Sequence, residues 1–263
     1  SDGTAQCWGQ ETYGATDSPS TTAFETLTSG WAHNCGLRAA DGIAVCWGNP
    51  PGNYALDPPP ATAFSSIACG YIHTCAIRQD NSNAECWGSN SNGQISVPAG
   101  GTQYSTIAAG GFHTCALRRA DGRADCWGSS QSTAAPTTRF RAIAAGWSHT
   151  CAIRESDGSA ECWGDNSHGK STPPANGASY VAIAAGNSHT CTLDEHGPVV
   201  CWGANNHNQT DVPSGNYTAI ASHLGEHTCA LSAADGDATC WGRNNHNQAV
   251  LPTMPPSPPP SPP

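Results

Sequence analysis

Lysine is nearly missing from this chain of 263 residues, in which Lys170 is the only one. Charged residues make up 11 % of the sequence, against about 25 % in an average globular protein. The formal net charge is −10 at neutral pH. Because nucleic-acid backbones are bound by clustered lysine and arginine, this balance argues against a nucleic acid as partner.

Long hydrophobic runs are missing as well. No stretch approaches the roughly 18 consecutive apolar residues of a membrane-spanning helix, so we expect no insertion into a membrane. No segment repeats its apolar residues at intervals of three and four, which leaves no amphipathic helix. Short runs of Ile, Val, Thr, Tyr and Trp lie between Gly, Asn, Asp and Pro, and this pattern indicates an all-β fold.

Catalytic patterns are the third absence. No Ser/His/Asp spacing, glycine-rich phosphate loop or pair of carboxylates stands out from the rest of the sequence. The sequence therefore predicts a protein that is not an enzyme and has no catalytic residues, no metal site and no cofactor. Two weaker alternatives are a divalent metal near His168, His207 and His246, and an active site at the rim of the fold.

The tripeptide Cys-Trp-Gly is what the chain has in abundance, with seven copies at steps of 36 to 40 residues. The copies begin at Cys7, Cys46, Cys86, Cys126, Cys162, Cys201 and Cys240. Before every copy but the first lies a segment such as residues 107–117, followed by a polar turn that usually contains Asp-Gly. Asp-Gly between two β-rich runs is typical of a hairpin, because glycine accepts positive φ. About four short strands per repeat predict a seven-bladed β-propeller over residues 1–252.

Six repeats carry a second cysteine upstream of the tripeptide. In a hairpin folded about the polar turn the two cysteines lie directly opposite each other, at a spacing that suits a disulfide. The expected disulfides, one per complete blade, are Cys35–Cys46, Cys75–Cys86, Cys115–Cys126, Cys151–Cys162, Cys191–Cys201 and Cys229–Cys240. Zinc is the alternative, but the close Cys-x-x-Cys spacing of many zinc sites is absent. Stable disulfides predict an extracellular protein.

Two cysteines are left over, and one of them marks an incomplete first blade. Cys7 has no upstream cysteine in its repeat, and Cys69 stands where other repeats have alanine. We expect both to be unpaired or to form intermolecular bonds. The first blade could be completed by upstream sequence, could be small, or could take strands from a neighbouring molecule, which would build a homopolymer.

The last segment, residues 253–263, differs abruptly in composition. Its prolines and serines predict an extended polyproline II tail with no core of its own. It resembles the Ser-Pro-rich stretches of hydroxyproline-rich glycoproteins from plant and green-algal walls. That resemblance implies hydroxylation and O-glycosylation at Pro255, Pro256, Ser257, Pro258, Pro259, Pro260, Ser261, Pro262 and Pro263. Two N-glycosylation sequons occur within the propeller, at Asn208 and Asn216.

The complete unit, Ile-Ala-Ala-Gly-x-x-His-Thr-Cys-Ala-Leu followed by Asp-Gly-x-Ala-x-Cys-Trp-Gly-x-Asn-x-x-Gly-Gln, resembles the repeat of the regulator of chromosome condensation superfamily. It is most similar to the extracellular branch, which includes the beta-lactamase inhibitory propeller and the ectodomains of crinkly-type plant receptor kinases. The resemblance covers residues 1–252 and implies a seven-bladed propeller that binds other molecules and does not catalyse.

Aromatic residues that depart from the repeat are the candidate binding surface. The tripeptide tryptophans alternate with cysteine along a strand, so we expect them between blades. The histidine two residues before each first cysteine is expected to serve its own blade, with a metal-binding or pH-sensing ring as the alternative. Trp31, Tyr71, Phe112 and Trp147 fall close together in register and predict a binding rim.

Two functions remain open at this stage. The first is an extracellular structural or assembly glycoprotein of a cell wall, fibre or surface appendage, with other protein chains and glycans as partners. The alternative is a recognition propeller that binds a protein or glycan through its rim.

Overall fold

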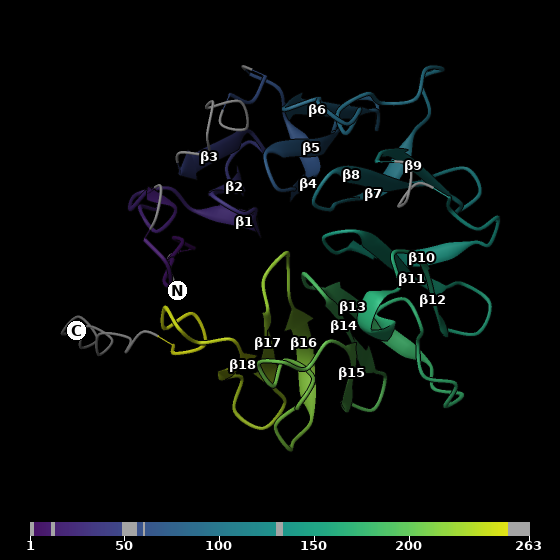
Figure 1. Ribbon diagram of the computed structural model, residues 1–263. Helices are drawn as coiled ribbons and strands as arrows, with labels where there is room; N and C mark the ends of the chain where they lie inside the picture. The colour runs from purple at the N-terminus through teal and green to yellow at the C-terminus, as the bar shows by residue number, and fades with distance from the viewer. Residues whose placement is uncertain (1–2, 12–13, 49–56, 60, 130–133, 252–263) are drawn as a thin grey trace, which may run out of the picture.

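The computed structural model describes residues 3–11, 14–48, 57–59, 61–129 and 134–251. Within these residues the chain forms six three-stranded antiparallel sheets, which lie as blades around a common centre (Figure 1). The predicted tail, residues 253–263, lies outside the described residues. The fold is therefore an all-β assembly of repeated blades.

Each blade is a meander whose three strands pair in chain order. The blades are β1 (Phe24–Ser29), β2 (His33–Arg38), β3 (Ala44–Gly48); β4 (Phe64–Cys69), β5 (His73–Arg78), β6 (Ala84–Gly88); β7 (Tyr104–Ala109), β8 (His113–Arg118), β9 (Ala124–Gly128); β10 (Phe140–Ala145), β11 (His149–Arg154), β12 (Ala160–Gly164); β13 (Tyr180–Ala185), β14 (His189–Asp194), β15 (Val199–Gly203); β16 (Tyr217–Ala221), β17 (His227–Ser232), β18 (Ala238–Gly242). We call them blades 1 to 6 in this order.

The turn between the second and third strands is the Asp-Gly turn expected from the sequence. In blade 1 Gly42 has φ 69°, and the Asp41 carboxylate accepts a hydrogen bond of 3.1 Å from the backbone N–H of Ile43. This turn sets the register in which Cys35 lies opposite Cys46.

A disulfide joins the second and third strands of every blade. The Cα atoms of the bonded cysteines are 4.0 to 4.1 Å apart. The pairs are Cys35–Cys46, Cys75–Cys86, Cys115–Cys126, Cys151–Cys162, Cys191–Cys201 and Cys229–Cys240. Cys7 and Cys69 are free thiols, the first half-buried and the second buried.

The described blades have three strands where the sequence suggests about four. The segment after each third strand is held by side chains instead of a strand ladder. In blade 2 the Asn90 side-chain oxygen accepts a hydrogen bond of 3.2 Å from the backbone N–H of Ile95. Asn166, Asn205 and Asn244 make the equivalent bond in blades 4, 5 and 6. Asparagine competes in this way with strand pairing.

Apolar residues fill the space between neighbouring blades. The second strand of one blade packs against the first strand of the next. Ile77 of blade 2, for example, lies in one core cluster with Tyr104, Ile107 and Trp127 of blade 3. The tryptophans of the six third strands are buried, as the strand alternation predicts.

In blades 1 to 5 the histidine that opens the second strand connects its blade to the following one. Its Nε2 lies 2.7 to 3.0 Å from a threonine hydroxyl of the next blade. These pairs are His33–Thr74, His73–Thr114, His113–Thr150, His149–Thr190 and His189–Thr228. Burial lowers the pKa of these five histidines, so the rings are neutral at physiological pH. Their role in the fold is structural.

The N-terminal segment lies beside blade 6 and repeats a contact found between blades (Figure 1). The Trp8 indole donates a hydrogen bond of 3.2 Å to the Gln248 carbonyl. Trp202 and Trp241 make the same bond to the equivalent residues of the preceding blade, Lys170 and Gln209. The N-terminal Cys-Trp-Gly therefore sits against blade 6 as a third strand would.

Two leucines of blades 1 and 6 are exposed although their counterparts in other blades are buried or half-buried. Leu27 of blade 1 is 52 % exposed, whereas Ile67 at the same position of blade 2 is 6 % exposed. Leu231 of blade 6 is 42 % exposed, and its counterparts in blades 1 to 5 are at most 3 % exposed. Blades 1 and 6 thus present apolar faces next to the N-terminal segment.

Candidate binding face

The predicted rim residues are carried by the tight turns between the first and second strands. Trp31, Tyr71 and Trp147 directly follow the glycine that begins this turn in blades 1, 2 and 4, and Phe112 is one position later in blade 3. Because the second strands begin here, all four side chains belong to the same face of the molecule. We call these four residues the aromatic cluster.

The four rings form one contiguous group. Tyr71 is central, with ring centroids 4.7 Å from Trp31, 5.4 Å from Phe112 and 5.0 Å from Trp147. Phe112 and Trp147 are 5.5 Å apart and nearly perpendicular. These are favourable spacings for aromatic pairs. Trp31 is 45 % exposed and the other three are partly exposed, so the cluster presents apolar surface to solvent.

Gly111 of blade 3 allows this arrangement. It occupies the position that holds Trp31, Tyr71 and Trp147 in the other blades, and its backbone N–H donates a hydrogen bond of 3.1 Å to the Trp147 carbonyl. A Cβ atom at position 111 would lie 2.6 Å from that carbonyl oxygen and 3.1 Å from the Trp147 ring. Without a side chain here, Trp147 reaches across blade 3 to Tyr71.

The opposite face is charged. The turns between second and third strands lie there and carry arginine–carboxylate pairs on the surface. These pairs include Arg38–Asp41, Arg78–Asp80 and Arg118–Asp121. In the turns of the aromatic face, residues 29–33, 69–73 and 109–113 include no Asp, Glu, Lys or Arg. The two faces of the protein therefore suit ligands of different chemistry.

The asparagine-rich loops after the third strands border the aromatic face. One of them holds the only lysine, whose side chain is 4 % exposed and whose Nζ lies 2.7 Å from the Asp165 carboxylate. The hydrogen bonds from Lys170 and Ser167 hold the pKa of Asp165 well below its usual range. Lys170 takes the place of Gln94 and Gln209, so this ion pair belongs to the loop and offers no free charge to a ligand.

One residue of blade 6 reaches across the centre of the molecule. The turn between β16 and β17 is one residue longer than its counterparts, since six residues lie between Ile220 and His227 and five lie between Ile183 and His189. This insertion places the His223 ring against the backbone carbonyl of Cys69 in blade 2. The contact ties blades 2 and 6 together near the turns that carry the aromatic cluster.

Comparison with known proteins gives the family. The repeat family described as "Regulator of chromosome condensation (RCC1) repeat" matches this chain at residues 64–94, 104–132, 140–170, 180–209 and 225–248. Together these segments make up more than half of the chain. The chain belongs to the RCC1 repeat family. No curated protein sequence matches it significantly.

Among solved structures, the RCC1-repeat chain is similar to two plant receptor ectodomains. The CRINKLY ectodomain of the Arabidopsis thaliana receptor kinase ACR4 has 25 % identity and a TM-score of 0.76, with 92 % of this chain and 87 % of that chain covered. The ectodomain of the Physcomitrella patens receptor kinase CR4 has 26 % identity and a TM-score of 0.74. The match to CR4 covers 83 % of this chain and 63 % of that chain, less than two thirds of its length.

A third structure supports the fold alone. Prp20p from Saccharomyces cerevisiae has 16 % identity and a TM-score of 0.71, with 87 % of this chain and 74 % of that chain covered. With its six disulfides and its similarity to receptor ectodomains, this RCC1-repeat protein is extracellular. No helix within the described residues is long and apolar enough to cross a membrane.

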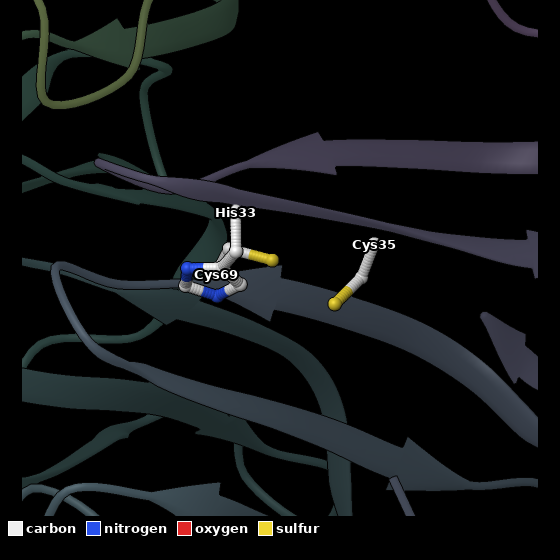
Figure 2. Close-up of side chains that lie close together, drawn as sticks. All are labelled: His33, Cys35 and Cys69. Atoms are coloured by element: carbon white, nitrogen blue, oxygen red, sulfur yellow. The ribbon is translucent and has the colours of Figure 1, made fainter. Parts of the chain in front are cut away.

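A group of possible metal ligands forms between blades 1 and 2 but does not suit a metal ion. Ligand atoms of His33, Cys35 and Cys69 lie within 4.8 Å of one another (Figure 2). Cys35 is bonded to Cys46, and the Nε2 of His33 already meets a threonine hydroxyl. Burial raises the pKa of the Cys69 thiol to about 12, which keeps it protonated. In this RCC1-repeat protein the three residues are part of the packed interior between blades 1 and 2.

The remaining predicted site residues are placed as follows. Asn208 and Asn216 are both exposed, so the structure leaves room for a glycan at each sequon. The three histidines of the asparagine-rich loops do not converge: His207 lies 3.3 Å from the Glu226 carboxylate, and no group of three possible ligands in the described residues includes His168 or His246. The tail residues Pro255–Pro263 lie outside the described residues.

Proposed function

We propose that this protein is an extracellular recognition module that binds a protein or glycan ligand through the aromatic cluster and catalyses no reaction. The observation that carries this proposal is the contiguous group of four partly exposed rings, carried by turns that hold no charged residue. Aromatic residues at the centre of a patch are typical of binding hot spots. Catalysis is disfavoured because the repeated histidines are buried, neutral and bonded to threonine.

The relatives support a binding role. Two of the similar structures are ectodomains of receptor kinases. The partners of those proteins are not carried over to this chain, where the proposal rests on the aromatic cluster.

A peptide-display selection tests the proposal. We expect a random library selected on the intact, oxidised protein to yield peptides that bind at least tenfold more weakly to the Trp31→Ala, Trp147→Ala variant. Gly111→Ala keeps all four rings but crowds the Trp147 backbone, so it should also weaken these peptides. A glycan panel assayed with the same variants covers the second ligand class.

The matched control is Trp8→Ala, because Trp8 is 40 % exposed but belongs to a Cys-Trp-Gly segment and not to the turns that carry the cluster. It should leave binding unchanged. Peptides and glycans that bind the wild type and the cluster variants equally well, with unaltered thermal unfolding of both, would show that the cluster is not the binding surface.

A second candidate function is assembly, and the exposed leucines favour it. We propose that the N-terminal Cys-Trp-Gly segment is the outer strand of a seventh blade. The first two strands of that blade would come from a hairpin like those of the other repeats, which would pack against this segment and against Leu27 and Leu231. Such a hairpin would cover both leucines and place a cysteine opposite Cys7. Supplied by a neighbouring chain, it would link copies in a head-to-tail fashion.

A synthetic peptide with the sequence of residues 104–118 provides a direct test of this second candidate. Under mildly oxidising conditions we expect one disulfide-linked peptide per protein, at Cys7, and a higher thermal midpoint. Cys7→Ser should still be stabilised by the peptide but form no adduct. A peptide with Leu117→Asp is the control. Absence of both adduct and stabilisation with the unaltered peptide would rule the candidate out.

The setting and the modifications of the protein are further parts of the proposal. A cell wall, fibre or surface appendage would suit an assembling module with a hydroxylated and O-glycosylated tail and N-glycans at Asn208 and Asn216. Intact-mass measurement before and after deglycosylation tests the sugars; an unmodified mass in the native source would remove this part.

A further inference from the structure

The C-terminal segment has the chemistry of a polyproline ligand. Eight of the twelve residues 252–263 are proline, and none of them is charged. Sequences of this kind favour the extended polyproline II helix, whose backbone carbonyls have no internal partners. Proline supplies no N–H group, so such a segment presents apolar rings and hydrogen-bond acceptors but few donors.

The aromatic cluster offers the complementary groups. Its rings provide apolar faces, and neither the Tyr71 hydroxyl nor the Trp147 indole N–H has a hydrogen-bond partner among the described residues. Aromatic-lined grooves that combine flat rings with such donors are the usual recognition surface for proline-rich segments. The preformed polyproline helix also loses little conformational entropy on binding.

The charges around the aromatic cluster do not favour a charged ligand over the proline-rich segment. The turns that carry Trp31, Tyr71 and Phe112 hold no charged residue, and the arginine–carboxylate pairs of these blades lie on the opposite face. The proline-rich segment is likewise uncharged. An acidic or basic ligand would gain no ion pair from these turns, because the charged residue of this kind of turn, Glu226, belongs to blade 6, whereas an uncharged proline-rich segment leaves no charge unpaired.

We propose that the aromatic cluster of one molecule binds the proline-rich segment 255–263 of a second copy in the form that carries no sugar. The proposal rests on the recognition function above and specifies its ligand. The last described residues, Val250 and Leu251, lie beside Cys7 and Trp8, whereas the cluster belongs to blades 1 to 4. Twelve residues in polyproline form span about 37 Å and are semi-rigid, which favours a neighbouring molecule over the segment's own blades.

Head-to-tail association follows from this contact. The segment and the cluster are different surfaces, so each bound molecule leaves one of each free, and the interface does not close on itself as a symmetric dimer does. Copies of the protein would therefore associate progressively as concentration rises.

The test uses an unmodified synthetic peptide of residues 253–263 and tryptophan fluorescence of the folded, oxidised protein. We expect saturable binding that is at least tenfold weaker for Trp147→Ala and for Tyr71→Phe combined with Trp31→Ala. Trp8→Ala is the matched control and should bind normally. A peptide with every proline replaced by alanine should not bind. In sedimentation velocity, the chain of 263 residues should associate with concentration, and a version ending at Leu251 should not.

The outcomes separate this inference from the proposed function. If the peptide fails to bind while display-selected peptides or glycans still depend on Trp31 and Trp147, the ligand assignment is wrong and the recognition face stands. If nothing depends on the cluster, both fall. Equal binding of the proline peptide to wild type and to the folded Trp147→Ala variant would also overturn the inference.

Discussion

Lowering the pH from 7 to about 4.5 is expected to unfold this protein. Six histidines, five of them buried and His223 half-buried, are neutral in the folded state, because removal from water lowers their pKa to about 4 or about 3. The values are about 4 for His33, His113, His189 and His223 and about 3 for His73 and His149. In the unfolded chain a histidine has a pKa of about 6.5.

The sign of the effect follows from these two values. Above about pH 6.5 neither state binds the protons, and the folded state keeps its full stability. As the pH falls below that value, the histidines become protonated in the unfolded chain but stay neutral in the folded state. This difference lasts until the pH reaches the folded pKa values of about 4 and about 3. Each histidine then lowers the free energy of unfolding by about 1.4 kcal/mol per pH unit.

Near pH 4.5 the summed loss of unfolding free energy from six such histidines is comparable to or larger than the total stability of a domain, which is about 5–15 kcal/mol. Denaturant unfolding followed by circular dichroism at pH 8, 6, 5 and 4 measures the effect. We expect the slope between pH 6 and 5 to correspond to several protons, and His113→Gln to reduce it by about one proton. Unfolding free energies that stay constant from pH 7 to 4.5 would contradict the buried neutral histidines.

Reduction of the disulfides is expected to unfold the protein at neutral pH. Each disulfide closes a loop with a sequence separation of 10 or 11 residues, which contributes about 2–4 kcal/mol. Six of these contributions are comparable to or larger than the whole stability of a typical domain of about 5–15 kcal/mol. The apolar clusters and the His–Thr contacts between blades remain after reduction, but they are already formed in the oxidised protein and do not replace the lost cross-links.

Thermal unfolding with and without a strong reductant measures this. Removal of one disulfide by Cys115→Ala with Cys126→Ala should lower the melting temperature by about 5–15 °C. Cys69→Ala is the control, because alanine occupies the same position in blades 3, 4 and 5 and no disulfide is lost. A fully reduced chain that melts within a few degrees of the oxidised one would show that the disulfides do not hold the blades together.

Local patterns made much of the fold predictable. The Asp-Gly turns and the opposed cysteines are set by neighbouring residues, so the hairpin of blade 1 and its Cys35–Cys46 bond could be inferred from spacing alone. The strand count per blade could not, because Asn90 and its counterparts bind the backbone of their own loop. A polar segment after a strand has a similar sequence whether its backbone pairs with the strand or is bound by the side chains of its own loop.

The site was predictable in part for the same reason. Register placed Trp31, Tyr71, Phe112 and Trp147 on one rim, and the structure brings their rings into contact. The contact between Trp147 and Tyr71 across blade 3 depends on the missing side chain of Gly111, which is a tertiary effect.

Two other features were missed. The inserted residue between Ile220 and His227 was a visible signal for the turn that brings His223 to Cys69. The exposure of Leu27 and Leu231 has no sequence signal, because both residues match buried positions of the repeat.

The central claim is that ligands bind at the aromatic cluster, and the indole N–H signals in a nitrogen–proton correlation spectrum test it most directly. The nine tryptophans include six buried between or within blades, together with Trp8, Trp31 and Trp147. On addition of a binding peptide, we predict large shifts for Trp31 and Trp147 and little change for the buried six. Shifts confined to Trp8 or to the buried tryptophans would contradict the account.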